Sequence, residues 1–320
     1  MTVLQRGRRV LVTGGAGFLG SHLVEALAVR GAEVTVADNL STGRMSNLDG
    51  VASSIRFERL DLATDDIAPL LVEARFDTIF HAAASAYVPT SIEDPAGDLR
   101  DNVLATHRLL VAIRSSASAT ELVHFSTAAV YGEGRGAPMS EDEPTRPVSP
   151  YGISKLAAEL YVTMYARLFG LRACSVRLFS LFGPRLRKQV VWDFMNRIAA
   201  DSGELVVHGD GGETRDLSHV NNAVAAALLI ADCGAKNGEV YNFGAGASTS
   251  INDLAHTLCS AMDAAPALRY TLSGRAGDAR RWSADVERLR ALGYTPSITY
   301  EEGIFDTVAW FRSIPADSRK

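Results

Sequence analysis

The stretch TGGAGFLG, residues Thr13–Gly20, decides the fold of this 320-residue chain. It follows an apolar run, Arg9–Thr13, and leads into a segment with helical periodicity, Ser21–Arg30. Glycine lets the backbone turn tightly and approach a pyrophosphate, which then lies at the N-terminus of the helix. A glycine-rich turn alone is weak evidence, because such turns are common. Between a strand and a helix, however, this turn predicts a dinucleotide-binding unit.

Apolar segments and helical segments alternate through the first half of the chain, and this alternation predicts a parallel sheet with right-handed crossovers. The expected fold is therefore α/β, a doubly wound Rossmann sheet with a smaller C-terminal substrate-binding domain. We expect the first domain to span residues 1–182, with segments near 214–245 packing back on it, and the second to comprise mainly residues 183–320. The expected strands are Arg9–Thr13, Glu33–Asp38, Ile55–Asp61, Thr78–Ala82, Glu121–Ser126 and Ala173–Phe179, and the clearest helices are Ser21–Arg30, Asp98–Ser115 and Ser149–Gly170.

Composition excludes several classes of function. Hydrophobic residues make up 47% and charged residues 22% of the chain, and the net charge is −5 without a basic block. A polymeric nucleic-acid partner is therefore not expected. Three scattered cysteines without a C-x-x-C pair favour neither disulfides nor a metal site, and they fit a cytoplasmic location. No segment is expected to enter a membrane.

Asp38 ends the second expected strand, where a carboxylate can hydrogen-bond the ribose hydroxyls of an adenosine. A carboxylate there would repel a 2′-phosphate, so the sequence favours NAD over NADP. The alternative is a structural turn followed by a surface aspartate.

Tyr151 and Lys155 are one helical turn apart and project from the same face. Tyrosine has a pKa of about 10 and is a poor base. A nearby ammonium and a positively charged nicotinamide would stabilise the phenolate. The phenolate could then take a proton from a sugar hydroxyl of the substrate. Ser126 or Thr127, at a strand end, could hydrogen-bond the same hydroxyl. The pair Y-x-x-x-K alone occurs by chance, but beside a nucleotide fold it predicts proton transfer coupled to hydride transfer.

The ordered motifs along nearly the whole chain resemble the extended short-chain dehydrogenase/reductase superfamily, especially its NAD-dependent sugar-nucleotide epimerases and dehydratases. The motifs are TGGAGFLGSH, DNLSTG at Asp38–Gly43, HAAA at His81–Ala84, STAAVYG at Ser126–Gly132, YGISK at Tyr151–Lys155, RLFSLFGPR at Arg177–Arg185, GDGGETRDLSHV at Gly209–Val220, YNFGAG at Tyr241–Gly246 and RAGDARR at Arg275–Arg281.

The resemblance implies two sets of binding residues. The cofactor set comprises Gly14, Gly17, Phe18, Leu19, Gly20, Asp38, Asn39, Asp61, Leu62, Ala82, Ala83, Ala84 and Asn102, together with Tyr151 and Lys155. The substrate set, for a UDP-sugar, comprises Ser180, Arg185, Arg187, His208, Arg215, Arg275 and Asp278. Within it Arg215 and Arg275 would bind the diphosphate and Asp278 the ribose. The chemistry agrees, because guanidinium groups suit phosphate oxygens and carboxylates suit ribose hydroxyls.

Two alanines narrow the reaction. Dehydratases of the family carry Asp-Glu where this chain has Ala128-Ala129, and alanine can neither donate nor remove a proton. The resemblance therefore implies C4 epimerisation through a transient 4-keto sugar. UDP-glucuronate 4-epimerases carry a small hydroxyl residue at the position of Ser180 and an arginine at that of Arg187. We therefore expect UDP-glucuronate and UDP-galacturonate, with UDP-glucose and UDP-galactose, or an N-acetylhexosamine, as the alternative. A solvated basic run over residues 185–188 competes with the substrate role of Arg187.

Several alternatives remain open. The chain could be a sugar-nucleotide reductase or dehydratase, or a non-catalytic NAD-binding regulator on the same fold. His81 is expected to be a packed histidine rather than a ligand, and His208 could either stack on the base or lie in a loop. The helices Asp98–Ser115 and Pro150–Leu168 resemble those of a four-helix homodimer interface in the superfamily, but their apolar faces could instead be consumed by the core. The apolar stripe of the second helix contains Ile153, Leu156, Ala157, Leu160, Met164 and Leu168.

Overall fold

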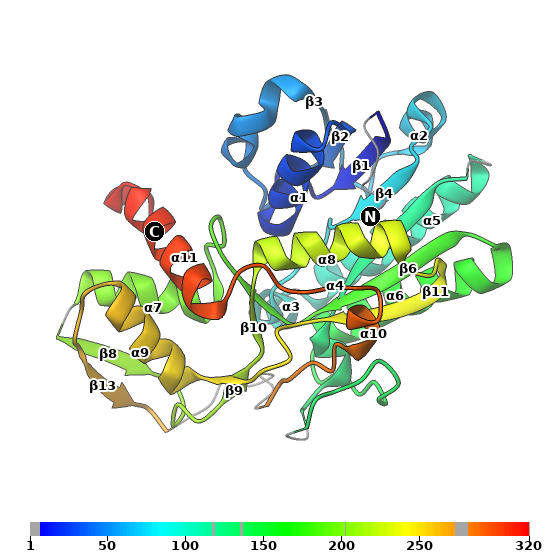
Figure 1. The fold of residues 1–320 in the computed structure, drawn as a ribbon. Helices are drawn as coiled ribbons and strands as arrows, with labels where there is room; N and C mark the ends of the chain where they lie inside the picture. The colour runs from blue at the N-terminus through cyan, green and yellow to red at the C-terminus, as the bar shows by residue number, and fades with distance from the viewer. Residues whose placement is uncertain (1–6, 117–118, 135–136, 202, 273–280, 320) are drawn as a thin grey trace.

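The computed structural model describes residues 7–116, 119–134, 137–201, 203–272 and 281–319. Within these residues, parallel strands form a seven-stranded sheet in the order β11-β6-β5-β4-β1-β2-β3 (Figure 1). The predicted α/β doubly wound sheet is confirmed. The first two strands match their expected ranges, the next three differ by one or two residues at one end, and β6 is shifted by one residue at both ends. The strands are β1 (Arg9–Thr13), β2 (Glu33–Asp38), β3 (Ile55–Arg59), β4 (Thr78–His81), β5 (Glu121–Thr127), β6 (Arg172–Leu178) and β11 (Asn237–Phe243).

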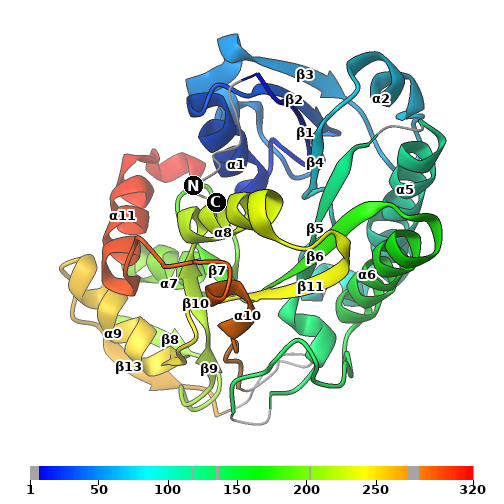
Figure 2. The same cartoon turned by 45° about the vertical axis from the view of Figure 1, so that its right-hand side comes forward.

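Helices cover both faces of the sheet (Figure 2). One face packs against α1 (Phe18–Val29) and α8 (Val220–Cys233), and the other packs against α2 (Ala68–Ala74), α5 (Ala105–Ser115) and α6 (Pro150–Phe169). Two expected helices differ in detail. The first begins at Phe18, directly after the glycine turn. The second is divided into α4 (Pro95–Leu99), a π-helical turn (Arg100–Leu104) and α5.

Helix α6 has the ends that its sequence predicts. The Ser149 side chain accepts a hydrogen bond from the Gly152 amide at 3.1 Å, and Gly170 ends the helix in the left-handed conformation. The core takes up only part of the apolar stripe: Leu156 and Met164 pack against core clusters, whereas Ile153, Leu160 and Leu168 are each more than half exposed. The opposite face, which carries Lys155, is buried against the sheet.

A second, smaller region holds its own apolar core, built by α7 (Gln189–Ala200), α9 (Ile251–Ala261), α11 (Tyr300–Ser313) and β8 (Glu204–Val207). Strand β7 (Ser180–Phe182) pairs with β10 (Leu217–His219) where the chain enters this region. The chain then returns, because α8 packs on α1 and β11 pairs with β6. The other elements are α3 (Val88–Glu93), α10 (Glu287–Arg290), β9 (Thr214–Arg215), β12 (Thr249–Ser250), β13 (Ala267–Tyr270) and the 3-10 helices Met45–Ser54, Ala128–Tyr131 and Ala316–Ser318. In the part of the chain described, no helix is long and apolar enough to span a bilayer.

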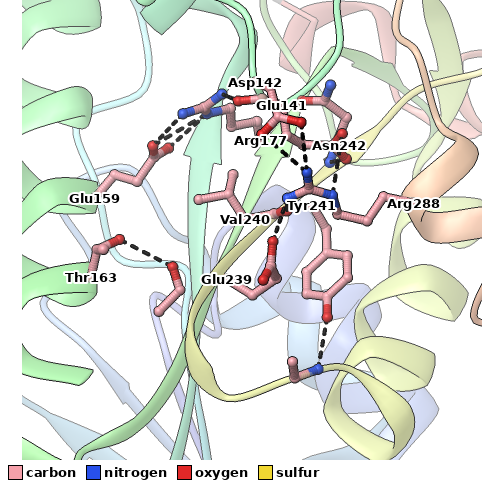
Figure 3. A network of polar contacts seen from close by, with 12 residues as sticks. Glu141, Asp142, Glu159, Thr163, Arg177, Glu239, Val240, Tyr241, Asn242 and Arg288 are labelled. Carbon is pink, nitrogen blue, oxygen red and sulfur yellow. Dashed lines mark hydrogen bonds and ion pairs between the residues drawn. The ribbon is translucent and has the colours of Figure 1, made fainter. Parts of the chain in front are cut away.

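A buried polar network fixes β11 at the sheet edge (Figure 3). The Arg177 guanidinium forms an ion pair with Glu159 on α6 at 2.6 Å and donates to the Tyr131 hydroxyl at 2.8 Å. That hydroxyl donates to the Asn242 side-chain oxygen at 2.7 Å, and the backbone N–H of Asn242 donates to the Glu141 carboxylate at 2.7 Å. The network joins β6, β11, α6 and the 3-10 helix Ala128–Tyr131, and its charges are paired, as buried charges must be.

Candidate functional site

A large cavity of about 1000 Å³ lies at the carboxyl edge of the sheet, where ligands bind in open α/β folds. It brings together most residues expected from the sequence. Asn102, Arg185 and Arg187 do not line it, and Arg275 and Asp278 lie outside the described residues. The expected residues that line the cavity are Gly14, Gly17, Phe18, Leu19, Gly20, Asp38, Asn39, Asp61, Leu62, Ala82, Ala83, Ala84, Ser126, Thr127, Tyr151, Lys155, Ser180, His208 and Arg215.

The glycine turn forms one wall of the cavity, and two of its glycines leave no room for a side chain. Gly14 has a φ of +68°, and a Cβ there would lie 2.5 Å from the Ala83 amide nitrogen. A Cβ on Gly20 would lie 2.1 Å from the Gly14 carbonyl oxygen. The N-terminus of α1 therefore packs directly on the turn. A bare backbone at a helix N-terminus fits a pyrophosphate.

Asp38 holds this turn against the end of β2. Its carboxylate accepts hydrogen bonds from the Ala16 amide at 2.9 Å and the Leu40 amide at 2.7 Å. Burial raises the pKa of Asp38, and the two amides oppose that shift. A carboxylate offers about four lone-pair sites, so capacity remains for the ribose hydroxyls of a dinucleotide. Asn39 beside it donates to Asp61 at 3.1 Å.

Asn102 is buried and does not line the cavity, so its expected place near the cofactor stays a prediction. Its amide nitrogen donates to the Ser85 carbonyl at 3.1 Å, to Asp98 at 3.0 Å and to the Ser154 hydroxyl at 2.9 Å. Ser154 in turn donates to Asp98 at 2.5 Å. Asn102 therefore ties the cavity wall at Ser85 to the helix that carries Tyr151.

Tyr151 projects from the first turn of α6 and shares a hydrogen bond with the Thr127 side chain. Its backbone amide donates to the Ser91 hydroxyl at 3.1 Å. Burial raises the pKa of Tyr151 to about 12, the hydrogen bond with Thr127 opposes the shift, and Asp98 adds to it. Of the two candidate hydroxyls, Thr127 is the one paired with the tyrosine. The Ser126 hydroxyl lines the cavity and has no hydrogen-bond partner among the described residues.

Lys155 is buried one turn further along α6. Its ammonium donates to Nε2 of His124 at 3.4 Å, and Nδ1 of His124 lies 3.1 Å from the Ser175 hydroxyl. Burial lowers the pKa of Lys155 to about 8, opposed by Glu159 and Asp98. Burial, Thr127 and Asp98 set the pKa of Tyr151, and the expected lowering of that pKa by Lys155 is not found here.

Two of the four arginines expected to meet the substrate, Arg185 and Arg187, do not line the cavity. Arg185 pairs with Glu25 at 2.5 Å. Arg187 donates to the Ser318 carbonyl at 2.6 Å and lies near two tryptophan rings. The reason is local: Arg185 and Gln189 have positive φ values of 75° and 68°, which redirect the chain on both sides. Neither residue type announces such a conformation in a sequence.

Lys188, which the sequence analysis did not assign, lines the cavity instead. Other lining residues were also missed, among them Glu213 and Trp282. Glu213 lies within the GDGGETRDLSHV motif, and its Oε2 is buried without a partner among the described residues. Trp282, directly after the RAGDARR motif, lies 5.8 Å from the Arg215 guanidinium. Glu213 lies within one of the family-like motifs and Trp282 directly follows another, and this position was the signal in the sequence that could have identified them.

The expectations for two histidines have different outcomes. His81 is a packed histidine, as predicted: it contacts the Thr13 hydroxyl at 2.7 Å and the Thr106 hydroxyl at 2.9 Å. Burial lowers its pKa to about 3. His208 lines the cavity and contacts Arg197 at 3.3 Å. Among the residues that the structure describes, no cluster of His, Cys, Asp and Glu could hold a metal ion.

Comparison with known proteins adds independent evidence. The model of the NAD dependent epimerase/dehydratase family matches residues 10–244. A UDP-glucose 4-epimerase of Mycolicibacterium smegmatis is 38% identical over 313 residues, covering 95% of this chain and 99% of the relative.

Two solved structures are similar over nearly their whole length. The UDP-glucose 4-epimerase of Thermotoga maritima with UDP-glucose has a TM-score of 0.89 at 33% identity, with 95% and 98% of the two chains covered. The UDP-glucose 4-epimerase of Thermus thermophilus in complex with NAD has a TM-score of 0.88 at 35% identity, with 96% and 100% covered.

Proposed function

The chain belongs to the NAD dependent epimerase/dehydratase family, and we propose that it interconverts the C4 epimers of a UDP-sugar, with UDP-glucose and UDP-galactose as the first candidates. The similar proteins named above are UDP-glucose 4-epimerases, and this supports the UDP-hexose alternative over the uronate expected from the sequence.

The observation that carries the proposal is the arrangement around Tyr151. Its hydroxyl is paired with Thr127 in the same cavity as the glycine turn, and Lys155 lies one turn behind it. Ala128 and Ala129 are buried beside them and offer no carboxylate. The site can therefore move a proton at one sugar hydroxyl, but it lacks the acid and base that dehydration requires.

The cofactor is NAD, and the glycine turn and Asp38 fit its pyrophosphate and adenosine ribose. When bound there, NAD would supply reversible hydride transfer at C4 of the sugar. We propose that Tyr151 takes the proton of the C4 hydroxyl and gives it back. The Thr127 hydroxyl orients both the Tyr151 hydroxyl and the C4 hydroxyl of the sugar. The Lys155 ammonium stabilises negative charge that develops on the Tyr151 oxygen.

Inversion requires the ketone to present its other face before the hydride returns. The cavity of about 1000 Å³ is at the upper end of the range for ligand pockets, and Ser180, Leu181 and Val190 form part of its wall. We propose that the sugar turns against this wall while the nucleotide stays held near Arg215 and Trp282.

UDP-glucuronate is the second candidate substrate. Ser180 favours it, because its side chain lines the cavity and is a small hydroxyl. Arg187 gives it no support, because its guanidinium is directed at Ser318 rather than at the cavity. This balance leads us to rank the UDP-hexose first.

We also propose that the protein forms a homodimer through α5 and α6. The exposed apolar side chains on these helices are Val111, Ile153, Leu160, Tyr161 and Leu168. Exposed apolar side chains on two adjacent helices favour association with another apolar surface.

The experiment that tests the proposal is incubation of the protein with a panel of UDP-sugars and identification of products by NMR. We expect UDP-glucose and UDP-galactose to interconvert without added NADH and without accumulation of free NADH. Stoichiometric NADH release would contradict an epimerase, and faster turnover of UDP-glucuronate than of UDP-glucose would reverse our ranking. A protein that binds NAD but converts no sugar would favour the regulator.

A further inference from the structure

Three cationic side chains of Lys or Arg line the cavity within the described ranges: Lys155, Lys188 and Arg215. Two of them have neighbours that suggest their role. Lys155 stands behind the catalytic tyrosine, and Arg215 lies against Trp282 at the far end. Lys188 has no role in the reaction derived above. A cation lining a substrate cavity requires an explanation, because removing a charge from water is costly.

Lys188 is half-buried, and its contacts leave most of its donor capacity unused. The ammonium donates to the Ala86 carbonyl at 2.9 Å and lies 5.6 Å from the centre of the Tyr87 ring. Throughout the described chain, no carboxylate lies within ion-pair distance of it. An ammonium has three N–H donors, so two remain for a ligand. Burial lowers the pKa of Lys188, as expected for a charge without a protein counter-ion.

The position of Lys188 assigns it to the sugar end of the cavity. Its partners, Ala86 and Tyr87, directly precede α3, and Ser91 on α3 accepts the hydrogen bond from the Tyr151 amide at 3.1 Å. The ammonium is thus anchored to the segment that contacts the catalytic residue. Arg215 instead stacks near Trp282, at the end we assign to the nucleotide.

Building on the proposed function, we infer that Lys188 is a substrate-recognition residue that binds an anionic oxygen on the sugar side of the substrate. Two groups have that chemistry: the phosphate attached to the sugar, and the C6 carboxylate of a uronic acid. Both present oxygens that an ammonium can engage through charge-assisted hydrogen bonds. The first group is common to all UDP-sugars, whereas the second would make Lys188 a determinant of uronate specificity.

The test compares ligand binding by calorimetry in the NAD-loaded protein for wild type and four variants. Lys188→Met removes the charge and keeps most of the chain length. Lys188→Gln is a second neutral variant in case the first does not fold. Lys188→Arg keeps the charge, and Arg187→Met removes the neighbouring charge that faces away from the cavity. The probes are UDP-glucose and UDP-glucuronate, and a thermal melt confirms that each variant is folded.

We expect the neutral Lys188 variants to raise Kd about 10- to 150-fold, the loss typical of a charge-assisted hydrogen bond. Lys188→Arg should recover most of the affinity, and Arg187→Met should match wild type. An equal loss for both sugars identifies the phosphate as the partner, and a loss confined to UDP-glucuronate identifies the carboxylate. Either outcome supports the inference.

Unchanged Kd values in both neutral variants would overturn the inference, and so would a loss that Arg187→Met shares to the same extent. Turnover is measured on the same samples. A wild type that binds UDP-glucose without epimerising it refutes the proposed function but leaves the Kd comparison valid. A wild type that epimerises it, beside Lys188 variants with unchanged Kd, refutes only the role of Lys188. Absence of binding to either sugar refutes both.

Discussion

The two ends of the cavity are built by different means. At the cofactor end short segments that follow β1, β2 and β4 form the walls, and at the glycine turn the wall is bare backbone without room for a Cβ. At the substrate end the walls are side chains from segments that begin at Ser180, Lys188, His208 and Trp282. The first end is fixed by strand order and local turn geometry. The second depends on how irregular segments orient individual side chains.

This difference indicates where substitutions should act. Backbone walls tolerate no added atoms, so small changes at the cofactor end should have large effects. Side-chain walls lose one contact at a time, so changes at the substrate end should have graded effects. Tyr151 lies where the two ends meet, and its removal should have the largest effect.

Tyr151→Phe should lower kcat by about 10²- to 10⁴-fold, the usual contribution of a positioned acid–base group. NAD and UDP-sugar should still bind, because the ring remains. Steady-state kinetics and calorimetry measure the two effects separately. Tyr161→Phe, on the exposed side of the same helix, is the matched control. A Tyr151→Phe enzyme with near-normal kcat would rule out Tyr151 as the proton acceptor.

Gly20→Ala should raise the Kd for NAD by at least about tenfold, which corresponds to about 1.4 kcal/mol. The added Cβ would lie 2.1 Å from the Gly14 carbonyl oxygen, so the turn must shift. The NAD content of the purified protein and a fluorescence titration measure the loss. The control is Gly50→Ala, where the nearest atom is 3.6 Å away. Normal NAD retention in Gly20→Ala would mean that the backbone wall adapts.

Asp38→Asn should lower the preference for NAD over NADP by about five- to tenfold. The amide keeps one acceptor oxygen but loses the charge that strengthens the ribose hydrogen bonds and repels a 2′-phosphate. Titration of wild type and variant with both dinucleotides gives the ratio of Kd values. Equal affinity of the wild type for NAD and NADP would contradict the proposed role of Asp38 in selecting NAD.

Ser180→Ala should have the smallest effect, a rise of about two- to tenfold in the Kd for UDP-sugar. It removes one neutral hydrogen-bonding group from the substrate wall. The Kd for NAD should be unchanged, and that contrast is the measurement of interest. If Ser180→Ala weakened NAD as strongly as Gly20→Ala, the two ends would not be separate binding regions.

The sequence predicted the local structure around the glycine turn well for a physical reason. A glycine turn between a strand and a helix and an acid at the next strand end depend on neighbours in the chain. The ranges of β1 and β2 and the caps of α6 at Ser149 and Gly170 followed from the same local rules. Parallel strands then bring their carboxyl ends to one edge.

The substrate end could not be predicted in the same way. Arg187 and Lys188 are adjacent cations; the sequence predicted a substrate role for Arg187, whereas Lys188 is the one that lines the cavity. Positive φ values at Arg185 and Gln189 decide which side chain meets the cavity, and neither residue type favours that conformation. The π-helical turn that places Asn102 beneath the cavity has no clear sequence signal either.

The return of β11 to the sheet has a consequence for dividing the chain. A fragment ending at Phe182 would retain the glycine turn, Asp38, Tyr151 and Lys155, yet it would lack both β11 and α8. The N–H and C=O groups of β6 would then form an open edge, and the apolar side of α1 would be uncovered. Such an edge pairs readily with another copy, so we expect the fragment to aggregate when expressed alone. The cofactor-binding half is thus one region in space, but it is built from segments that are not contiguous in the sequence.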